Sequence, residues 1–139
     1  MPRERFTQPG TKRLEISDGD WLLVKTGLNA GDQRKQDTLA VVPVLIDGRT
    51  VDRIDWSMYE FLRTDLWLVD WSLTKTENGK TVAITKSVDA LRALDPDDFD
   101  EINNAVYRHI VEWVASRKKR GVTERTLQQD DNASPTSQS

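Results

Sequence analysis

The sequence contains no cysteine and a single histidine, His109, among its 139 residues. Without cysteine the chain forms no disulfide, no thiolate nucleophile and no cysteine-ligated zinc site. No serine nucleophile or metal-ligand pattern surrounds His109, so we interpret it as a residue on the flank of a helix. The glycines form neither of the phosphate-binding patterns GxGxxG and GxxxxGK[ST]. These absences predict that the protein is not an enzyme and has no cofactor and no metal site.

Positive charge and long apolar runs are also scarce. The net charge is −3 although 31% of the residues are charged, and binding to phosphate backbones needs a strong positive excess. One basic run, at residues 117–120, is a weak nucleic-acid signal. No apolar stretch approaches the roughly 20 residues of a membrane-spanning helix, and the N-terminus resembles no signal peptide. We therefore expect a soluble, cytosolic protein that binds neither nucleic acid nor membranes.

Tryptophan is what the chain has in abundance. Five occur, at Trp21, Trp56, Trp67, Trp71 and Trp113, and three of them directly follow an aspartate. Tryptophan rings bury a large area and dominate both protein cores and protein interfaces. The composition therefore favours a protein that folds and binds another protein.

The length fits one domain with a core that needs no disulfide or metal. Residues 1–11, with two prolines and scattered charge, are expected to form a flexible arm. Residues 121–139 are polar and are expected to form a disordered tail. The single globular domain is therefore expected over residues 12–120.

The N-terminal half of the domain has strand and turn signals. Pro43 lacks an N–H, so its segment is interpreted as an edge strand or an extended loop, and a helical continuation from Thr38 remains the alternative. The Asp47-Gly48 pair is a favoured two-residue hairpin turn. We expect strands over 12–16, 21–24, 40–46 and 50–54, and a polar helix over 30–38 that is capped by Asn29.

A better marked helix begins near Ser57. Ser57 and Glu60 have the spacing of a capping box, and Trp56 with Phe61 has the spacing of a hydrophobic staple. Apolar residues then continue on one helical face, which predicts a helix to about Trp71. The residues on that face are Met58, Phe61, Leu62, Leu66 and Val69.

Two further helices follow a short polar hairpin near residues 77–85, whose turn is expected at Glu77-Asn78-Gly79-Lys80. Ser87 is expected to cap a helix over 88–94, and Asp95-Pro96 to begin a helix over 96–120 that ends at Gly121. The acidic residues after Asp95 suit a helix start and lack the spacing of a calcium loop. A buried stripe is expected on the last helix at Phe99, Ile102, Val106, Ile110 and Trp113. The fold class is therefore α+β: a small N-terminal antiparallel sheet packed with C-terminal amphipathic helices, followed by a disordered C-terminal tail.

The order of several short motifs resembles the small tail assembly chaperones and neighbouring tail-morphogenesis proteins of long-tailed bacteriophages. These motifs are the Asp-Gly-Asp-Trp turn at residues 18–21, Leu28-Asn29-Ala30-Gly31, Asp70-Trp71-Ser72-Leu73, Ser87-Val88-Asp89-Ala90-Leu91 and Leu94-Asp95-Pro96-Asp97. The resemblance covers roughly residues 12–120. It implies a non-enzymatic protein of the bacterial host cytoplasm that keeps the tape measure protein soluble while tail tube subunits polymerise around it.

The segment from Trp56 to Leu73 contains the residues expected to bind a helical partner. Its anchor candidates are Trp56, Tyr59, Leu66, Trp67 and Trp71. Trp67 lies off the apolar face of its helix, so it either packs on a second element or is exposed as a partner-binding ring. Self-association of the chain is left open.

Two other functions compete with the chaperone hypothesis. A structural subunit of the virion, in the tail or at the head–tail junction, is the first alternative. A nucleic-acid-binding regulator is a more distant one, because its only support is the short basic run at residues 117–120.

Removal of the tail tests the domain boundary. Truncation after Gly121 is expected to shift the melting temperature by no more than about one or two degrees, because the tail has few apolar residues to bury. Thermal unfolding followed by circular dichroism measures the shift. A much larger drop would show that the tail docks on the domain.

Overall fold

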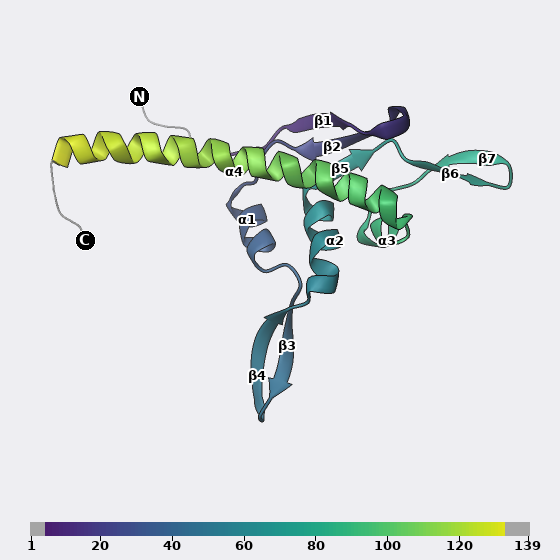
Figure 1. Ribbon diagram of the computed structural model, residues 1–139, viewed down its shortest axis with the longest axis horizontal. Coiled ribbons are helices and arrows are strands. Elements are labelled where there is room, and N and C mark those ends of the chain that lie inside the picture. The colour runs from purple at the N-terminus through teal and green to yellow at the C-terminus, as the bar shows by residue number, and fades with distance from the viewer. Residues whose placement is uncertain (1–4, 133–139) are drawn as a thin grey trace. The chain divides into compact units, whose positions relative to one another are not determined.

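The computed structural model describes residues 5–132, with side chains up to residue 119. The chain divides into two compact units, Met1–Tyr107 and Arg108–Ser139, and the last helix belongs to both. Antiparallel strands combined with helices make the fold α+β, as the sequence predicts. The elements, drawn in Figure 1, are β1 (Thr11–Glu15), a 3-10 turn (Ser17–Gly19), β2 (Trp21–Lys25), α1 (Ala30–Asp37), β3 (Val41–Ile46), β4 (Arg49–Ile54), α2 (Trp56–Trp67), β5 (Leu68–Trp71), β6 (Thr74–Glu77), β7 (Lys80–Ala83), α3 (Val88–Arg92) and α4 (Pro96–Asn132).

A three-stranded antiparallel sheet of order β1-β2-β5 forms the centre of the first unit. On the middle strand, Leu22 and Val24 are fully buried, while the residues between and beside them are half-buried. This alternation is that of a strand with one face on the core. Thr11, expected in the flexible arm, is already the first residue of β1, and the carbonyl of Gly10 accepts a hydrogen bond from the Thr26 amide at 2.9 Å.

Strand β5 contains an irregularity that changes which of its residues face the core. Leu68 pairs with Val24 and Asp70 pairs with Leu23, so Val69 is an extra residue, a β-bulge. Leu68 and Trp71 are three residues apart and would face opposite sides of a regular strand. Because of the bulge both are buried, at 1% and 5% exposed, whereas Val69 is 41% exposed.

Helix α2 starts and ends differently from the prediction. The side chain of Asp55 caps the helix by accepting the Ser57 amide at 3.1 Å, so Ser57 is not the cap. Trp56 is the first helical residue and is 69% exposed, which corrects the proposed staple. The helix ends at Trp67, because the next four residues form β5, which pairs with β2. The expected end near Trp71 was therefore wrong.

Trp67 lies fully buried where α2 meets β5. Its indole Nε1 donates a hydrogen bond of 2.6 Å to Oε1 of Gln36 on α1, which satisfies the one polar atom of the ring. A nearby pair of aromatic rings, Phe61 on α2 and Phe99 on α4, has centroids 4.4 Å apart. The interior of the first unit is therefore built around the inward side of α2.

Two hairpins have the turns that the sequence predicts. Asp47-Gly48 joins β3 to β4 and Asn78-Gly79 joins β6 to β7, with positive φ at all four residues. Both turns therefore match the turn type that favours two-residue hairpins. Each hairpin is a separate two-stranded sheet, and β3 is a strand, so the helical alternative from Thr38 was wrong.

The predicted caps of the other helices are confirmed. The Asn29 side chain accepts the Asp32 amide at 2.9 Å at the start of α1. The Ser87 hydroxyl accepts the Ala90 amide at 3.0 Å at the start of α3. Asp95 accepts the Asp97 amide at 3.1 Å before Pro96, the first residue of α4. Polar side chains thus fix where these helices begin.

Helix α4 is longer than expected and buries a wider stripe. It continues through Gly121 to Asn132, because an interior glycine costs a helix only about 1 kcal/mol. Residues 133–139 of the expected tail lie outside the described residues, and disorder of the tail stays a prediction. The interpretation of His109 as a residue on the flank of the helix was wrong. Its side of the helix is buried, with 8% of the residue exposed, because His109 lies one helical turn beyond the buried Ala105. Trp113 is only half-buried, with the Arg117 guanidinium 4.7 Å from its ring centroid.

Two tryptophans of α2 offer a matched stability test. Trp67→Ala is expected to lower the free energy of unfolding by about 3–5 kcal/mol, because it empties a fully buried site. Trp56→Ala, at the exposed end of the same helix, should cost about 1 kcal/mol or less. Urea denaturation at constant m-value measures both. Equal losses from the two variants would contradict the assigned burial.

Candidate functional site

Three aromatic rings and one arginine form an exposed cluster on the first unit. Trp56 and Tyr59 pack edge to face with ring centroids 5.3 Å apart. The Arg63 guanidinium carbon lies 5.7 Å from the Tyr59 centroid and 5.0 Å from that of Tyr107. Both distances fit cation–π contacts. We call Trp56, Tyr59, Arg63 and Tyr107 the aromatic cluster.

The helical repeat explains how the aromatic cluster forms. Trp56, Tyr59 and Arg63 are spaced by three and four residues, so they lie on one face of α2. Trp67 comes one helical turn after Arg63 on the same side of the helix, but the C-terminal end of α2 is buried, whereas Trp56 at its N-terminal end is 69% exposed. Tyr107 comes from α4, where it follows the fully buried Val106 and is itself 49% exposed. Two helices therefore present aromatic rings to one arginine.

A buried polar contact holds Arg63 in place. Its Nη2 donates to Oδ1 of Asn103 at 3.0 Å, and the Thr64 hydroxyl donates to the same oxygen at 3.0 Å. Thr64 is fully buried and Asn103 is 7% exposed, so water competes little for this acceptor. The arginine, and through it the two tyrosine rings, is thus held before any partner binds.

The charge of Arg63 is not balanced by an ion pair within residues 5–119. None of the ion pairs among residues 5–119 includes Arg63. Its Nε is buried and has no hydrogen-bond acceptor in that part of the chain. Such a cation, flanked by exposed rings, suits a partner that has an acidic residue beside apolar ones.

The structure separates the five anchor candidates of the sequence into three groups. Trp56 and Tyr59 belong to the aromatic cluster. Trp56 is 69% exposed and Tyr59 is half-exposed. Leu66 is half-buried. Trp67 and Trp71 are buried at 0% and 5% exposed, which corrects the expectation of an exposed Trp67. Trp67 packs on a second element, the alternative that the sequence left open.

Trp71 and the next residue, Ser72, have structural contacts. The Trp71 indole donates to the Ile84 carbonyl at 2.6 Å. The Ser72 hydroxyl donates to Asp20 at 2.8 Å and accepts the Trp21 amide at 2.9 Å. Two of the three Asp-Trp pairs therefore meet where β2 and β5 pair, and their contacts join the two strands.

Sequence reasoning missed Arg63 and Tyr107. A signal for Tyr107 was present, because it follows Val106 and so falls outside the stripe of Phe99, Ile102, Val106 and Ile110. An aromatic residue outside a buried stripe is a candidate for surface contacts. Arg63 had no comparable signal, because its position between two rings depends on how α2 and α4 pack.

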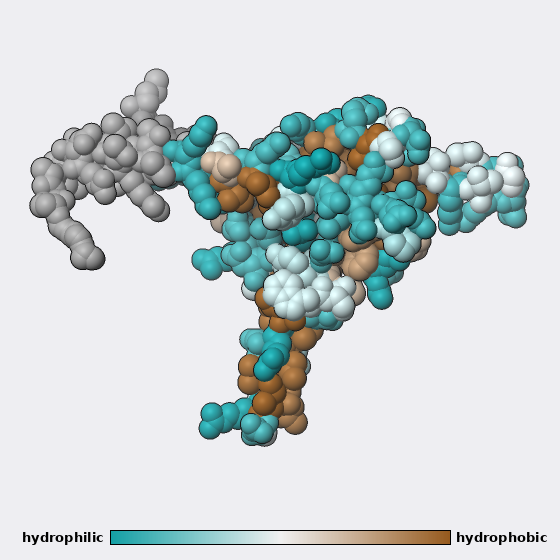
Figure 2. Space-filling model, in the orientation of Figure 1, coloured by the Kyte–Doolittle hydropathy of each residue, from teal (hydrophilic) through white to brown (hydrophobic). Residues whose placement is uncertain are grey.

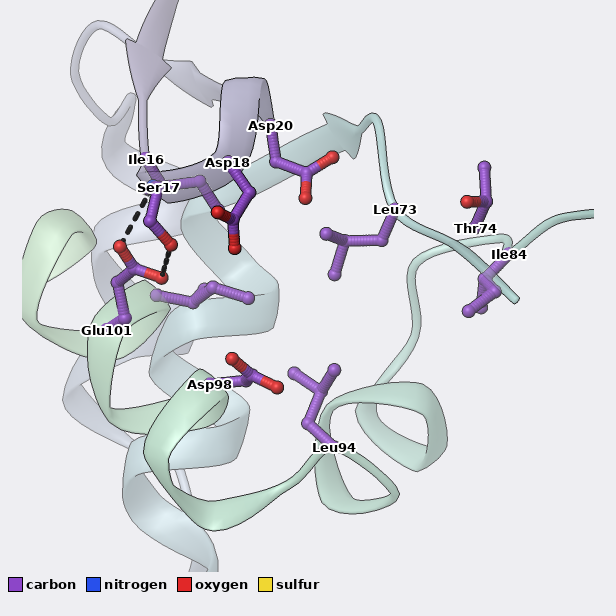
Figure 3. Close-up of a pocket in the computed structure, with 11 residues that line it drawn as sticks. Ile16, Ser17, Asp18, Asp20, Leu73, Thr74, Ile84, Leu94, Asp98 and Glu101 are labelled. Carbon is purple, nitrogen blue, oxygen red and sulfur yellow. Dashed lines mark hydrogen bonds between the residues drawn. The ribbon is translucent and has the colours of Figure 1, made fainter. Parts of the chain in front are cut away.

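A pocket of about 250 Å³ lies elsewhere in the first unit (Figure 3). Its rim has four carboxylates, and Glu101 is held by the Ser17 amide and hydroxyl at 2.9 and 2.8 Å. The concentration of negative charge disfavours phosphate-bearing ligands. The lining residues are Ile16, Ser17, Asp18, Asp20, Leu73, Thr74, Ile84, Leu94, Asp98, Glu101 and Ile102.

Metal clusters and membrane-spanning helices are both absent from the described residues. No cluster of three or more histidine, cysteine, aspartate or glutamate residues in that part of the chain has a metal-binding arrangement. Likewise, no helix among the described residues has the length and apolar character needed to cross a bilayer. The aromatic cluster is therefore the feature of the first unit with the clearest binding chemistry.

Comparison with known proteins completes the description of the site. No protein-family model, curated protein or solved structure matches the chain. A role for the aromatic cluster therefore rests on its own geometry.

Proposed function

We propose that the protein is a non-enzymatic assembly factor that binds an apolar helical partner, as a tail assembly chaperone of a long-tailed bacteriophage does. The observation that carries the proposal is the aromatic cluster, in which Trp56 is 69% and Tyr107 is 49% exposed. Exposed rings of this size are costly in water unless a partner covers them.

The residue types of the aromatic cluster support protein binding. Tryptophan, tyrosine and arginine are the residues most enriched among those that dominate binding energy at interfaces. Arg63 stacks on two tyrosines and is held by Asn103, so little side-chain freedom is lost when a partner docks. The rings and the Arg63 guanidinium of the aromatic cluster therefore form a preorganised surface on which a partner can dock.

The chemistry of the aromatic cluster indicates the kind of partner. An amphipathic helix presents apolar residues at three- and four-residue spacing, which fits rings that come from two helices. The unpaired cation at Arg63 favours a helix with an acidic residue next to that apolar stripe. The tape measure protein, a long helical protein that must stay soluble before the tail tube subunits enclose it, is the proposed partner.

Release is part of the proposed role. An assembly factor has to give up its partner when tube subunits polymerise, so a small interface suits it better than a large permanent one. The cluster has only four residues and fits that requirement. The site of action is proposed to be the cytoplasm of the bacterial host.

A second candidate function has one observation in its favour. The β3–β4 hairpin exposes apolar residues, among them Leu45 at 73%, away from the aromatic cluster's residues. Exposed apolar hairpins suit a subunit that is built into a larger assembly. A structural subunit of the virion would be found in purified mature particles, whereas a chaperone would be absent from them.

Co-expression tests the proposed function. Co-expression with a tape measure fragment is expected to make that fragment soluble, and Trp56→Ala and Tyr107→Ala should each weaken its binding about tenfold or more. Pull-down and calorimetry on the purified complex measure the effect. Binding should change little at moderate salt, because apolar contacts are not screened.

The control is Phe6→Ala, which removes an aromatic residue that is 88% exposed but belongs to the N-terminal arm. It should leave binding unchanged. Circular dichroism must show that all three variants stay folded. The proposal would be refuted if the control lost as much affinity for the fragment as the cluster variants do. It would also be refuted if the protein ignored the fragment and bound DNA with an affinity that falls steeply with salt.

A further inference from the structure

The β3–β4 hairpin has apolar residues on both of its faces. β3 consists entirely of apolar residues, and the hairpin forms its own two-stranded sheet within the described residues. A two-stranded hairpin is only marginally stable in water unless something packs on it. Figure 2 shows apolar side chains gathered along this hairpin. The hairpin therefore needs a covering partner.

One face of the hairpin has a single negative charge. Residues paired across two antiparallel strands point to the same side of the sheet. The pairs Val41–Ile54, Pro43–Asp52 and Leu45–Thr50 therefore share a face. Its apolar members Val41, Leu45 and Ile54 are 39%, 73% and 40% exposed. We call this the acidic face because Asp52 is its one charged residue.

The opposite face has positive charge. The pairs Val42–Arg53, Val44–Val51 and Ile46–Arg49 point to the other side of the sheet. Val42 and Val51 are 38% and 41% exposed, and both arginines are exposed. We call this the basic face. The two faces thus combine apolar surface with opposite charge.

Strand addition at the edges of the hairpin is disfavoured. Pro43, in the middle of β3, has no N–H to donate to an added strand. Strand β4 has three charged residues among six, which discourage edge-to-edge pairing. Contact through the faces of the hairpin is the remaining route.

We propose that the β3–β4 hairpin is an assembly arm, whose acidic face stacks on the basic face of the hairpin of a second copy of this chain. Asp52 of one copy then lies over Arg49 and Arg53 of the next, with apolar residues packed between them. Stacking of like faces would instead bring arginines onto arginines, or Asp52 onto Asp52, and like charges repel. Charge complementarity therefore selects the pairing of unlike faces.

This pairing has a consequence for the size of the assembly. A contact between two different surfaces leaves one face free at each end, so it continues to a ring or an open chain and does not stop at a dimer. One face of a six-residue hairpin measures about 20 by 10 Å, or roughly 200 Å². Stable complexes bury about 800 Å² per partner. The association should therefore be weak and should grow with concentration.

The inference is independent of the tape measure partner, because self-association is measured on the purified protein alone. Sedimentation velocity over a range of concentrations should show species larger than a dimer that increase with concentration. Asp52→Arg gives both faces the same charge and should leave the protein monomeric. Asp52→Arg combined with Arg49→Glu and Arg53→Glu reverses the two faces and should restore association. Leu45→Ser, which removes apolar contact without changing charge, should weaken it.

A matched control adds charge to the other hairpin. Thr81→Arg places a positive charge on β7 and should not alter association. Circular dichroism and thermal unfolding confirm that each variant is folded. The proposal would be overturned by a protein that stays monomeric at every concentration or that stops at the dimer. It would also be overturned if Asp52→Arg associated as well as the unchanged protein, or if the triple variant did not recover association.

Discussion

The direct passage from α2 into β5 is the constraint on which the first unit depends. Trp67 is the last residue of the helix and Leu68 the first of the strand, and both are buried with no linker between them. Because β5 is fixed by its pairing with β2, the rotation of α2 about its own axis is fixed as well. Trp56 and Arg63 lie on the same side of α2 as Trp67, and burial decreases along the helix, from Trp67 at 0% exposed at its C-terminal end to Trp56 at 69% at its N-terminal end. The junction with β5 thus buries one end of the helix and leaves Trp56 of the aromatic cluster at its exposed end.

Local chemistry made much of the fold predictable. The Asp-Gly and Asn-Gly turns, and the caps Asn29, Ser87 and Asp95, act through their own backbone contacts, so the sequence indicates them without knowledge of the tertiary fold. The end of α2 was different. Leu62, Leu66 and Val69 have the spacing of one helical face, which predicted a longer helix. In the structure, the bulge at Val69 buries both Leu68 and Trp71, which are three residues apart, as they would be on one face of a helix. A bulged strand therefore imitates a helix in sequence.

The candidate site was only partly predictable for a related reason. Trp56 and Tyr59 were in the right segment, but the exposure of Trp56 and the burial of Trp67 depend on where each end of α2 lies in the first unit, which no local pattern determines. Arg63 joins two rings from different helices, and its anchor Asn103 lies 40 residues away along the chain. Contacts of that range appear only when the helices pack. The aromatic cluster and the β3–β4 hairpin are two surfaces of different chemistry, and we propose that the first binds a helical partner and the second further copies of the chain.

The central claim is that the aromatic cluster, and not the buried tryptophans, meets the helical partner. Nuclear magnetic resonance of the indole N–H groups tests it directly, because each of the five tryptophans gives its own signal and Trp56→Phe assigns one of them. Titration with an amphipathic helix from a tape measure protein should shift the Trp56 signal and leave those of Trp67 and Trp71, which are bonded to Gln36 and Ile84, in place. An unchanged Trp56 signal in the presence of bound helix would contradict the account.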